Sequence, residues 1–156
     1  MGKGAMRAKA DEGLAMKIHA NCVPEEGLFC HESYDPAPMD MERNDLRLPK
    51  PIQVDANVAL VDKELVVNAD INCPLAMICG RCLDEFESKV HVATIFSYNV
   101  QPTDVVDITE DVRQEIILAY PMIPVCKPDC KGLCRECGQN LNLGTCKHQA
   151  GLEEGV

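Results

Sequence analysis

Apolar and polar residues alternate through the middle of the chain, from residue 52 to residue 100. Alternation with a period of two predicts half-buried antiparallel strands, because successive side chains of a strand point to opposite faces. The short connections between the runs favour a curled antiparallel sheet or a small β-barrel. The alternating runs cover residues 52–60, 65–73, 75–79 and 90–100.

A helical period replaces this alternation over residues 107–120. Asp107 or Thr109 can cap the first turn of such a helix, and Pro121 ends it. The apolar spacing predicts one main amphipathic helix that packs on the sheet, which gives an α+β fold. Its apolar positions are Val112, Ile116, Ala119 and Tyr120.

No period is sustained before residue 52, where five prolines interrupt the chain. We interpret residues 1–51 as an irregular N-terminal arm with one short strand at residues 16–22. Residues 1–15 are interpreted as an extension, because the sequence from Met16 resembles a natural start. The remaining parts are a β-rich core with the helix, a Cys-rich zinc loop and a tail, at residues 52–125, 126–148 and 149–156.

The chain contains ten cysteines in 156 residues. Charges are spread through its first residues without an apolar signal core, and no apolar run reaches the roughly 18–20 residues of a membrane span. We therefore expect a cytoplasmic protein whose thiols stay reduced. Clustered cysteines then favour metal or redox chemistry over disulfides.

Five cysteines and one histidine lie within the loop at residues 126–148, where few apolar residues are present to build a core. Cys134 and Cys137 have the C-x-x-C spacing that lets two thiolates reach one ion, and Gly138 permits the turn beneath them. Thiolates select zinc over Mg²⁺ or Ca²⁺, so we predict a structural Zn²⁺ site, with an iron–sulfur cluster or redox thiols as alternatives. The candidate ligands are Cys126, Cys130, Cys134, Cys137, Cys146 and His148.

Six candidates exceed the four places of a tetrahedral zinc, so spacing leaves the ligand set open. A second C-x-x-C pair, Cys79 and Cys82, raises an alternative with two sites of four ligands each. One site would join this pair to Cys126 and Cys130, and the other would use the four remaining groups. The pair could equally be two reduced, buried thiols at the end of a strand.

Acidic residues outnumber basic residues by 25 to 15, which gives a net charge of −10. Residues 52–125 hold four Lys and Arg against twelve Asp and Glu, or −8, which disfavours a broad phosphate-binding surface. Residues 126–148 hold four against two, or +2, so any RNA contact is expected to be small and confined to this loop. The candidate partner-binding cations are Lys127, Lys131, Arg135 and Lys147.

The sequence contains no phosphate-cradling Gly loop, no G-x-S-x-G elbow and no H-E-x-x-H helix. A zinc ion held by four protein ligands also leaves no coordination position for water. We therefore predict that the chain is not an enzyme. The catalytic alternative is a thiol redox protein that would use Cys79 and Cys82.

Three motifs occur in a fixed order: CGRCL at residues 79–83, DITEDVRQEIILAYPMIPVC at residues 107–126 and DCKGLCRECGQNLN at residues 129–142. Together they resemble the YceD family, the large ribosomal RNA subunit accumulation proteins, over roughly residues 52–148. The family usually ends its cysteine cluster in C-x-C, whereas this chain ends in Cys146-Lys147-His148. Histidine is also a zinc ligand, so the difference affects the last ligand and need not remove the metal.

The resemblance implies a non-enzymatic ribosome-biogenesis factor that supports accumulation or processing of 23S rRNA of the large subunit. It implies a ribosomal protein, a pre-ribosomal particle or 23S rRNA as partner, and we expect no membrane and no small-molecule substrate. The alternative is a zinc-stabilised protein-interaction module without RNA contact. The acidic middle of the chain favours protein contact, because ribosomal proteins are strongly basic.

Overall fold

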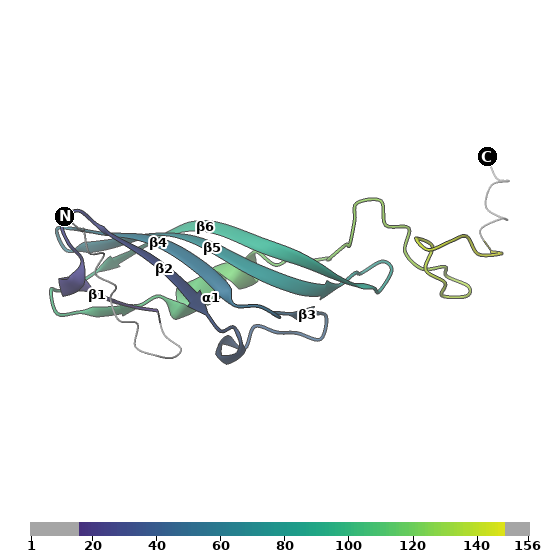
Figure 1. Cartoon of the computed structure of the whole chain (residues 1–156), viewed down its shortest axis with the longest axis horizontal. Coiled ribbons are helices and arrows are strands. Elements are labelled where there is room, and N and C mark those ends of the chain that lie inside the picture. The colour runs from purple at the N-terminus through teal and green to yellow at the C-terminus, as the bar shows by residue number, and fades with distance from the viewer. Residues whose placement is uncertain (1–15, 149–156) are drawn as a thin grey trace, which may run out of the picture.

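The structure, a computed structural model, describes residues 16–148 (Figure 1). Within these residues the chain forms mostly strands, with one α-helix near the C-terminal end. The elements in chain order are β1 (Lys17–His19), η1 (Ala20–Cys22), β2 (Leu28–Tyr34), η2 (Ala37–Met39), β3 (Leu46–Arg47), β4 (Ile52–Val61), β5 (Glu64–Ile78), β6 (Glu85–Asn99), β7 (Val105–Asp107) and α1 (Thr109–Leu118).

β5 is the central strand of the main sheet, and every pairing in this sheet is antiparallel. β6 pairs with β5 along its whole length, while β4 and the short β3 share the opposite edge of β5. β2 pairs with the outer edge of β4, so the strands run in the order β2–β4–β5–β6. The sheet is curled into a half-barrel, and β1 and β7 form a separate two-stranded ribbon (Figure 1).

One face of the sheet is apolar and buried, as the alternation predicts. Alternate residues of β4 from Ile52 to Val58 are buried, and so are alternate residues of β5 from Leu65 to Met77. α1 packs against β5 and β6 on this face. The predicted curled antiparallel sheet with one helix is therefore confirmed.

The alternating run at residues 75–79 does not form a strand of its own. It continues β5, because its buried residues keep the phase of the run before it. Pro74 lies between the two runs without interrupting the pairing with β6. β4 pairs with β5 only as far as Asn72, so at that edge no partner strand requires the N–H that proline lacks. The extended β5 carries Cys79 to the far end of the sheet.

α1 lies within the range predicted for the helix and buries Val112 and Ile116 completely. Neither predicted cap, Asp107 or Thr109, is the N-cap residue, which is Ile108. The Asp107 carboxylate accepts the Thr109 N–H at 2.9 Å, which satisfies a donor of the first turn. The helix ends at Leu118, so Ala119 and Tyr120 of the predicted stripe follow it.

The part of the predicted N-terminal arm that the structure describes is more regular than expected. β2 pairs with β4 along seven residues, and β3 pairs with β5. Met39, Met41 and Leu46 join the core. The sequence does not reveal these strands, because prolines interrupt the region and its apolar residues are few. A strand that pairs in a sheet needs apolar side chains on one face only. The predicted extension (1–15) and tail (149–156) lie outside the described residues.

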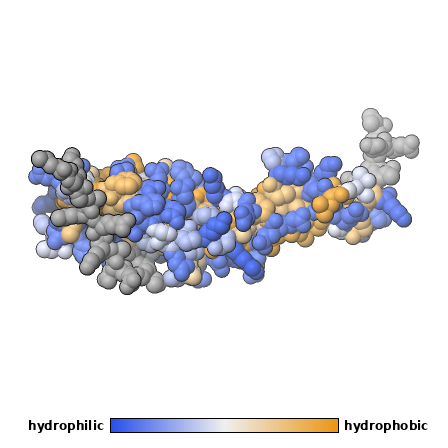
Figure 2. All heavy atoms as spheres, viewed as in Figure 1, coloured by the Kyte–Doolittle hydropathy of each residue, from blue (hydrophilic) through white to orange (hydrophobic). Residues whose placement is uncertain are grey.

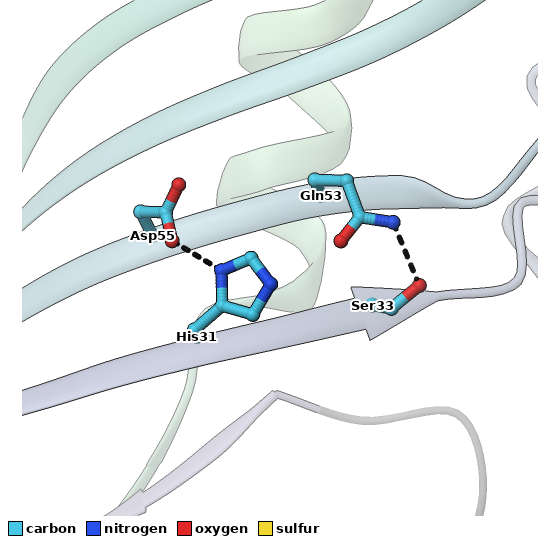
Figure 3. Close-up of polar contacts among 4 residues, drawn as sticks. All are labelled: His31, Ser33, Gln53 and Asp55. Carbon is cyan, nitrogen blue, oxygen red and sulfur yellow. Dashed lines mark hydrogen bonds and ion pairs between the residues drawn. The ribbon is translucent and has the colours of Figure 1, made fainter.

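The outer face of the sheet is polar and carries contacts between strands. His31 on β2 contacts the Asp55 carboxylate on β4, directly opposite it (Figure 3). His91 Nε2 on β6 lies 3.6 Å from the Asp70 carboxylate on β5. Two of the carboxylates at the centre of this face therefore each have a histidine beside them.

No helix among residues 16–148 is both long enough and apolar enough to cross a membrane.

Candidate metal centre

Eight side chains form two clusters, and in each cluster the four ligand atoms lie within 4.8 Å of one another. The first cluster joins the turn between β5 and β6 to the segment after α1 and consists of Cys79, Cys82, Cys126 and Cys130. The second cluster lies further along the chain and consists of Cys134, Cys137, Cys146 and His148. This is the division that the two-site alternative predicts. The extended β5–β6 hairpin brings the first pair to the segment after α1, which spacing in the sequence could not show.

The sulfur atoms of the first cluster have the spacing of a tetrahedral zinc site. Zn–S bonds of about 2.3 Å place ligand sulfurs about 3.8 Å apart at tetrahedral angles. Cys79 Sγ lies 3.8 Å from Cys130 Sγ, and Cys82 Sγ lies 3.7 Å from Cys126 Sγ. All of these cysteines are free thiols rather than disulfides. The donor set therefore fits a tetrahedral ion.

The second cluster has the mixed ligand set that the sequence suggested for it. Cys134 Sγ lies 4.0 Å from His148 Nδ1. Cys146 is buried, whereas Cys137 and His148 are exposed. This cluster therefore lies closer to solvent than the first, in which Cys79, Cys82 and Cys130 are buried with Phe86 and Val125 packed against them.

The two C-x-x-C turns fold in the same way, and we call each of them a knuckle. In the first knuckle, residues 79–84, the Leu83 N–H donates to the Cys79 carbonyl at 3.0 Å, and the Cys79 N–H donates to the Asp84 carbonyl at 2.9 Å. In the second knuckle, residues 134–139, the corresponding bonds are 2.9 and 2.8 Å long. Both knuckles therefore present two sulfurs from one tight turn, which is the geometry that a tetrahedral ion needs from paired ligands.

At least one thiol in each cluster favours its charged form. Burial acts to raise the pKa of the Cys79 thiol, but backbone N–H groups that point at its sulfur outweigh burial and lower the pKa to about 6. The backbone N–H groups of Cys137 and Glu136 lower the pKa of Cys134 to about 6. Burial raises the pKa of Cys126 to about 12. Since the thiolate is the form that binds metal, the lowered pKa values of Cys79 and Cys134 favour metal binding at both clusters.

Two asparagines just after the second knuckle contact the first knuckle and the first cluster. The Asn142 side chain donates to Cys130 Sγ at 3.3 Å and accepts the Lys131 N–H at 2.9 Å. The Asn140 side chain donates to the Asp84 carboxylate at 2.6 Å. Groups that hydrogen-bond to a ligand orient it and tune its affinity for metal. The sequence interpretation did not identify either asparagine, because their alternation in GQNLN carries no ligand spacing.

The four cations predicted to contact a partner are all exposed in residues 126–148, which we call the Cys-rich segment. They are Lys127, Lys131, Arg135 and Lys147.

Residues 96–154 match the family model of the Large ribosomal RNA subunit accumulation protein YceD. A maize (Zea mays) protein named Large ribosomal RNA subunit accumulation protein YCED homolog 1, chloroplastic, is 47% identical over 45 residues, which are 27% of this chain and 15% of the maize protein. These matches make the C-terminal part of the chain similar to the YceD family. The segment that matches the YceD model contains α1 and the whole second cluster, whereas Cys79 and Cys82 lie before it.

Longer matches come from mycobacteria. Uncharacterized proteins of Mycobacterium tuberculosis and Mycobacterium leprae are 36% identical over 106 residues and 34% identical over 107 residues. Each match covers 58% of this chain, and it covers 51% and 49% of the relatives. The chain therefore spans about half the length of these relatives. No solved structure matches the chain.

Proposed function

We propose that this chain is a ribosome-biogenesis factor that supports accumulation or processing of 23S rRNA of the large subunit. The observation that carries the proposal is the YceD-family match over residues 96–154. That match includes α1 and a complete four-ligand cluster, so it covers an element of the fold together with a site. The cytoplasm, where ribosomes assemble, is the corresponding location.

Both clusters are proposed to hold Zn²⁺. Three or four thiolates at tetrahedral spacing select zinc over the hard cations Mg²⁺ and Ca²⁺. The ion would hold the Cys-rich segment together, because its buried side chains include three of the cluster cysteines and few large apolar groups. Four protein ligands would occupy all the coordination positions of each ion, which leaves none for a substrate or water. We therefore propose that the chain acts by binding and not by catalysis.

The metal centres change the charge that a partner meets. Zn²⁺ with four thiolates carries a formal charge of −2, and with three thiolates and a neutral histidine it carries −1. Two filled sites would thus lower the net charge of the chain from −10 to −13. The negative charge of the two filled sites would offset the net charge of +2 that the sequence gives residues 126–148. This charge supports a basic protein, presented alone or in a pre-ribosomal particle, as the direct partner in preference to naked rRNA.

The proposed function is tested by deleting the gene for this chain in its own host and measuring the ratio of 23S to 16S rRNA. We expect the ratio to fall and the wild-type gene to restore it. The Cys134→Ser/Cys137→Ser variant should fail to restore the ratio, because it removes two ligands of one cluster. Cys22→Ser is the matched control, since Cys22 is exposed and belongs to neither cluster. An unchanged ratio in the deletion strain would exclude the proposed function.

A further inference from the structure

Leu83 has a backbone conformation that is unusual for its residue type. Three residues other than glycine have a positive φ within residues 16–148, and two of them are aspartates. Leu83, with a φ of 59°, is the third. The left-handed region is strained for a bulky side chain, because Cβ then crowds the backbone, whereas glycine is free of this strain. Strained residues of this kind persist at functional sites.

The second knuckle provides an internal comparison. Gly138 occupies the position that corresponds to Leu83, makes the corresponding hydrogen bond and has a φ of 73°. The same turn can therefore be closed with glycine in this chain. The leucine is not retained for burial either, since its side chain is 63% exposed. Neither the backbone nor the core accounts for a leucine at this position, which leaves contact with another molecule.

Two further exposed apolar side chains lie in the segment that contacts Gly80 of the same knuckle. Met122 is 99% exposed and Ile123 is 72% exposed. The segment that carries them is fixed to the knuckle, because the Gly80 N–H donates to the Pro124 carbonyl at 2.7 Å. A Cβ built on Gly80 would lie 3.2 Å from Ile123 Cγ2, so the two segments are in contact. We call Leu83, Met122 and Ile123 the knuckle patch.

Figure 2 shows apolar surface gathered at this end of the molecule, beyond the body of the sheet. An apolar surface that is exposed and rimmed by charges is typical of an interaction site.

The charges around the knuckle patch indicate the kind of partner. Residues 79–88 and 126–131, which surround the first cluster, contain four carboxylates and three cations. A zinc ion held by the four thiolates of this cluster would add −2, which gives −3 for the rim. Phosphates are repelled by such a rim, and so is a second copy of this chain, which brings the same charge. A cationic protein segment is attracted by it.

We propose that the knuckle patch, centred on Leu83, binds an apolar side chain on a cationic protein segment. The choice of a ribosomal protein as the source of this segment rests on the proposed function. The first metal centre would hold the knuckle in the shape that exposes Leu83, while the anionic rim attracts the basic residues of the partner. Leu83 would act as the apolar anchor of the interface, and glycine at the same position would preserve the turn without the anchor.

The test compares the wild-type protein with Leu83→Gly and Leu83→Asn, since both replacement residues tolerate a positive φ. Immobilised protein is titrated with individually purified large-subunit ribosomal proteins and, separately, with protein-free 23S rRNA. We expect at least one basic ribosomal protein to bind the wild-type chain, and both variants to bind it about tenfold more weakly or worse. Leu143→Gly is the matched control, because Leu143 is an exposed leucine outside the patch. It should bind as the wild type does.

Metal content and melting temperature separate loss of contact from loss of fold. Leu83→Gly should retain its metal and melt at the same temperature as the wild type or higher, because it relieves backbone strain. Equal binding by the wild type and Leu83→Gly would overturn the proposal, and so would the absence of any ribosomal protein that binds. It would also be overturned if Leu83→Gly weakened only binding to naked rRNA, or converted a wild-type dimer into a monomer. The rRNA ratio in the deletion strain tests the proposed function separately, because it can fall whichever surface binds.

Discussion

Asn142 contacts a sulfur of the first cluster without being one of the candidate ligands. It lies in the segment of the second cluster, but its amide group contacts Cys130 of the first cluster and the backbone of Lys131. A thiolate that accepts an N–H bond is fixed in direction and its negative charge is stabilised. We therefore expect the order of residues 131–142 to affect the metal affinity of the first cluster.

Asn142→Ala is expected to weaken metal binding at the first site by about tenfold to a hundredfold, the usual effect of removing a group that orients a ligand. Competition with a chromophoric chelator measures the affinity, and the thiolate absorption of the Co²⁺-substituted protein reports the environment of the sulfurs. Asn68→Ala is the control, since Asn68 is exposed on β5 far from both clusters in sequence. Equal affinities for the two variants would show that the amide does not support Cys130.

For individual residues, the sequence predicted the candidate metal ligands better than the side chains and backbone around them. Cys134 and Cys137 are separated by the spacing of a knuckle, and a tetrahedral ion imposes that spacing whatever the fold. Asn142 could not be predicted, because its bond to Cys130 depends on how residues 131–142 turn back. Leu83 was visible only as part of a family motif, since the sign of φ cannot be read from a leucine.

At the scale of elements, α1 holds the half-barrel together by covering its apolar face. Ile116 is completely buried, whereas its neighbour Ile117 is 37% exposed. Ile116→Ala should lower the free energy of unfolding by about 2–5 kcal/mol, because it removes buried methyl groups and leaves a cavity. Ile117→Ala provides a matched control and should cost much less. Urea unfolding followed by circular dichroism distinguishes them, and similar losses would contradict the observed orientation of α1.

The Cys-rich segment and the sheet are expected to respond separately to loss of metal. The sheet has its own apolar core, whereas the second cluster belongs to a segment without one. Cys137→Ser should therefore release the ion of the second cluster and loosen residues 134–148 while the strands stay folded. Elemental analysis of protein purified without added metal should give two zinc ions per chain for the wild type and one for the variant. Metal near zero in the wild type would refute the zinc assignment, and global unfolding of the variant would show that the segment is integral to the core.

Alternation in the sequence was sufficient to predict β4 and most of β5 and β6, because each has one face that is buried or, in β6, half-buried. It did not predict that the runs at residues 65–73 and 75–79 belong to one strand, which ends at Ile78. Proline usually interrupts a strand, and only the pairing pattern shows why Pro74 is tolerated. β2 was missed for a different reason. It is an edge strand of mixed composition whose regularity comes from pairing with β4.

At the scale of the whole molecule, the pairing of distant segments creates the first cluster and concentrates negative charge. Cys79 and Cys130 are 51 residues apart, and they meet because β5 and β6 extend beyond β4 to the turn that carries Cys79. The same hairpin continues into the acidic outer face, where Asp55 and Asp70 lie directly opposite each other. The first cluster and the acidic outer face thus lie along one elongated molecule (Figure 1).

This charge predicts how the chain distinguishes RNA from protein. The four cations of the Cys-rich segment allow at most four phosphate contacts, so the affinity for naked rRNA should fall by at most about 3–4 log units per log unit of salt. Thiolate-bound zinc would weaken this attraction further. We therefore expect weak or undetectable binding to naked 23S rRNA and clear binding to a basic ribosomal protein or a pre-ribosomal particle.

The contribution of the outer face is tested by reversing charges on it. The carboxylates predicted to contact a basic partner are Asp55, Asp62, Glu64 and Asp70. Glu64→Lys/Asp70→Lys is the pair to reverse, because Asp62 has a φ of 56° that a lysine would strain and the Asp55 carboxylate contacts His31. This double variant should weaken binding to particles more than neutralising all four cations of the Cys-rich segment does, in a titration of labelled particles at several salt concentrations. The opposite ranking, or tight and steeply salt-dependent binding to naked 23S rRNA, would show that the chain binds RNA first and that the acidic face has another purpose.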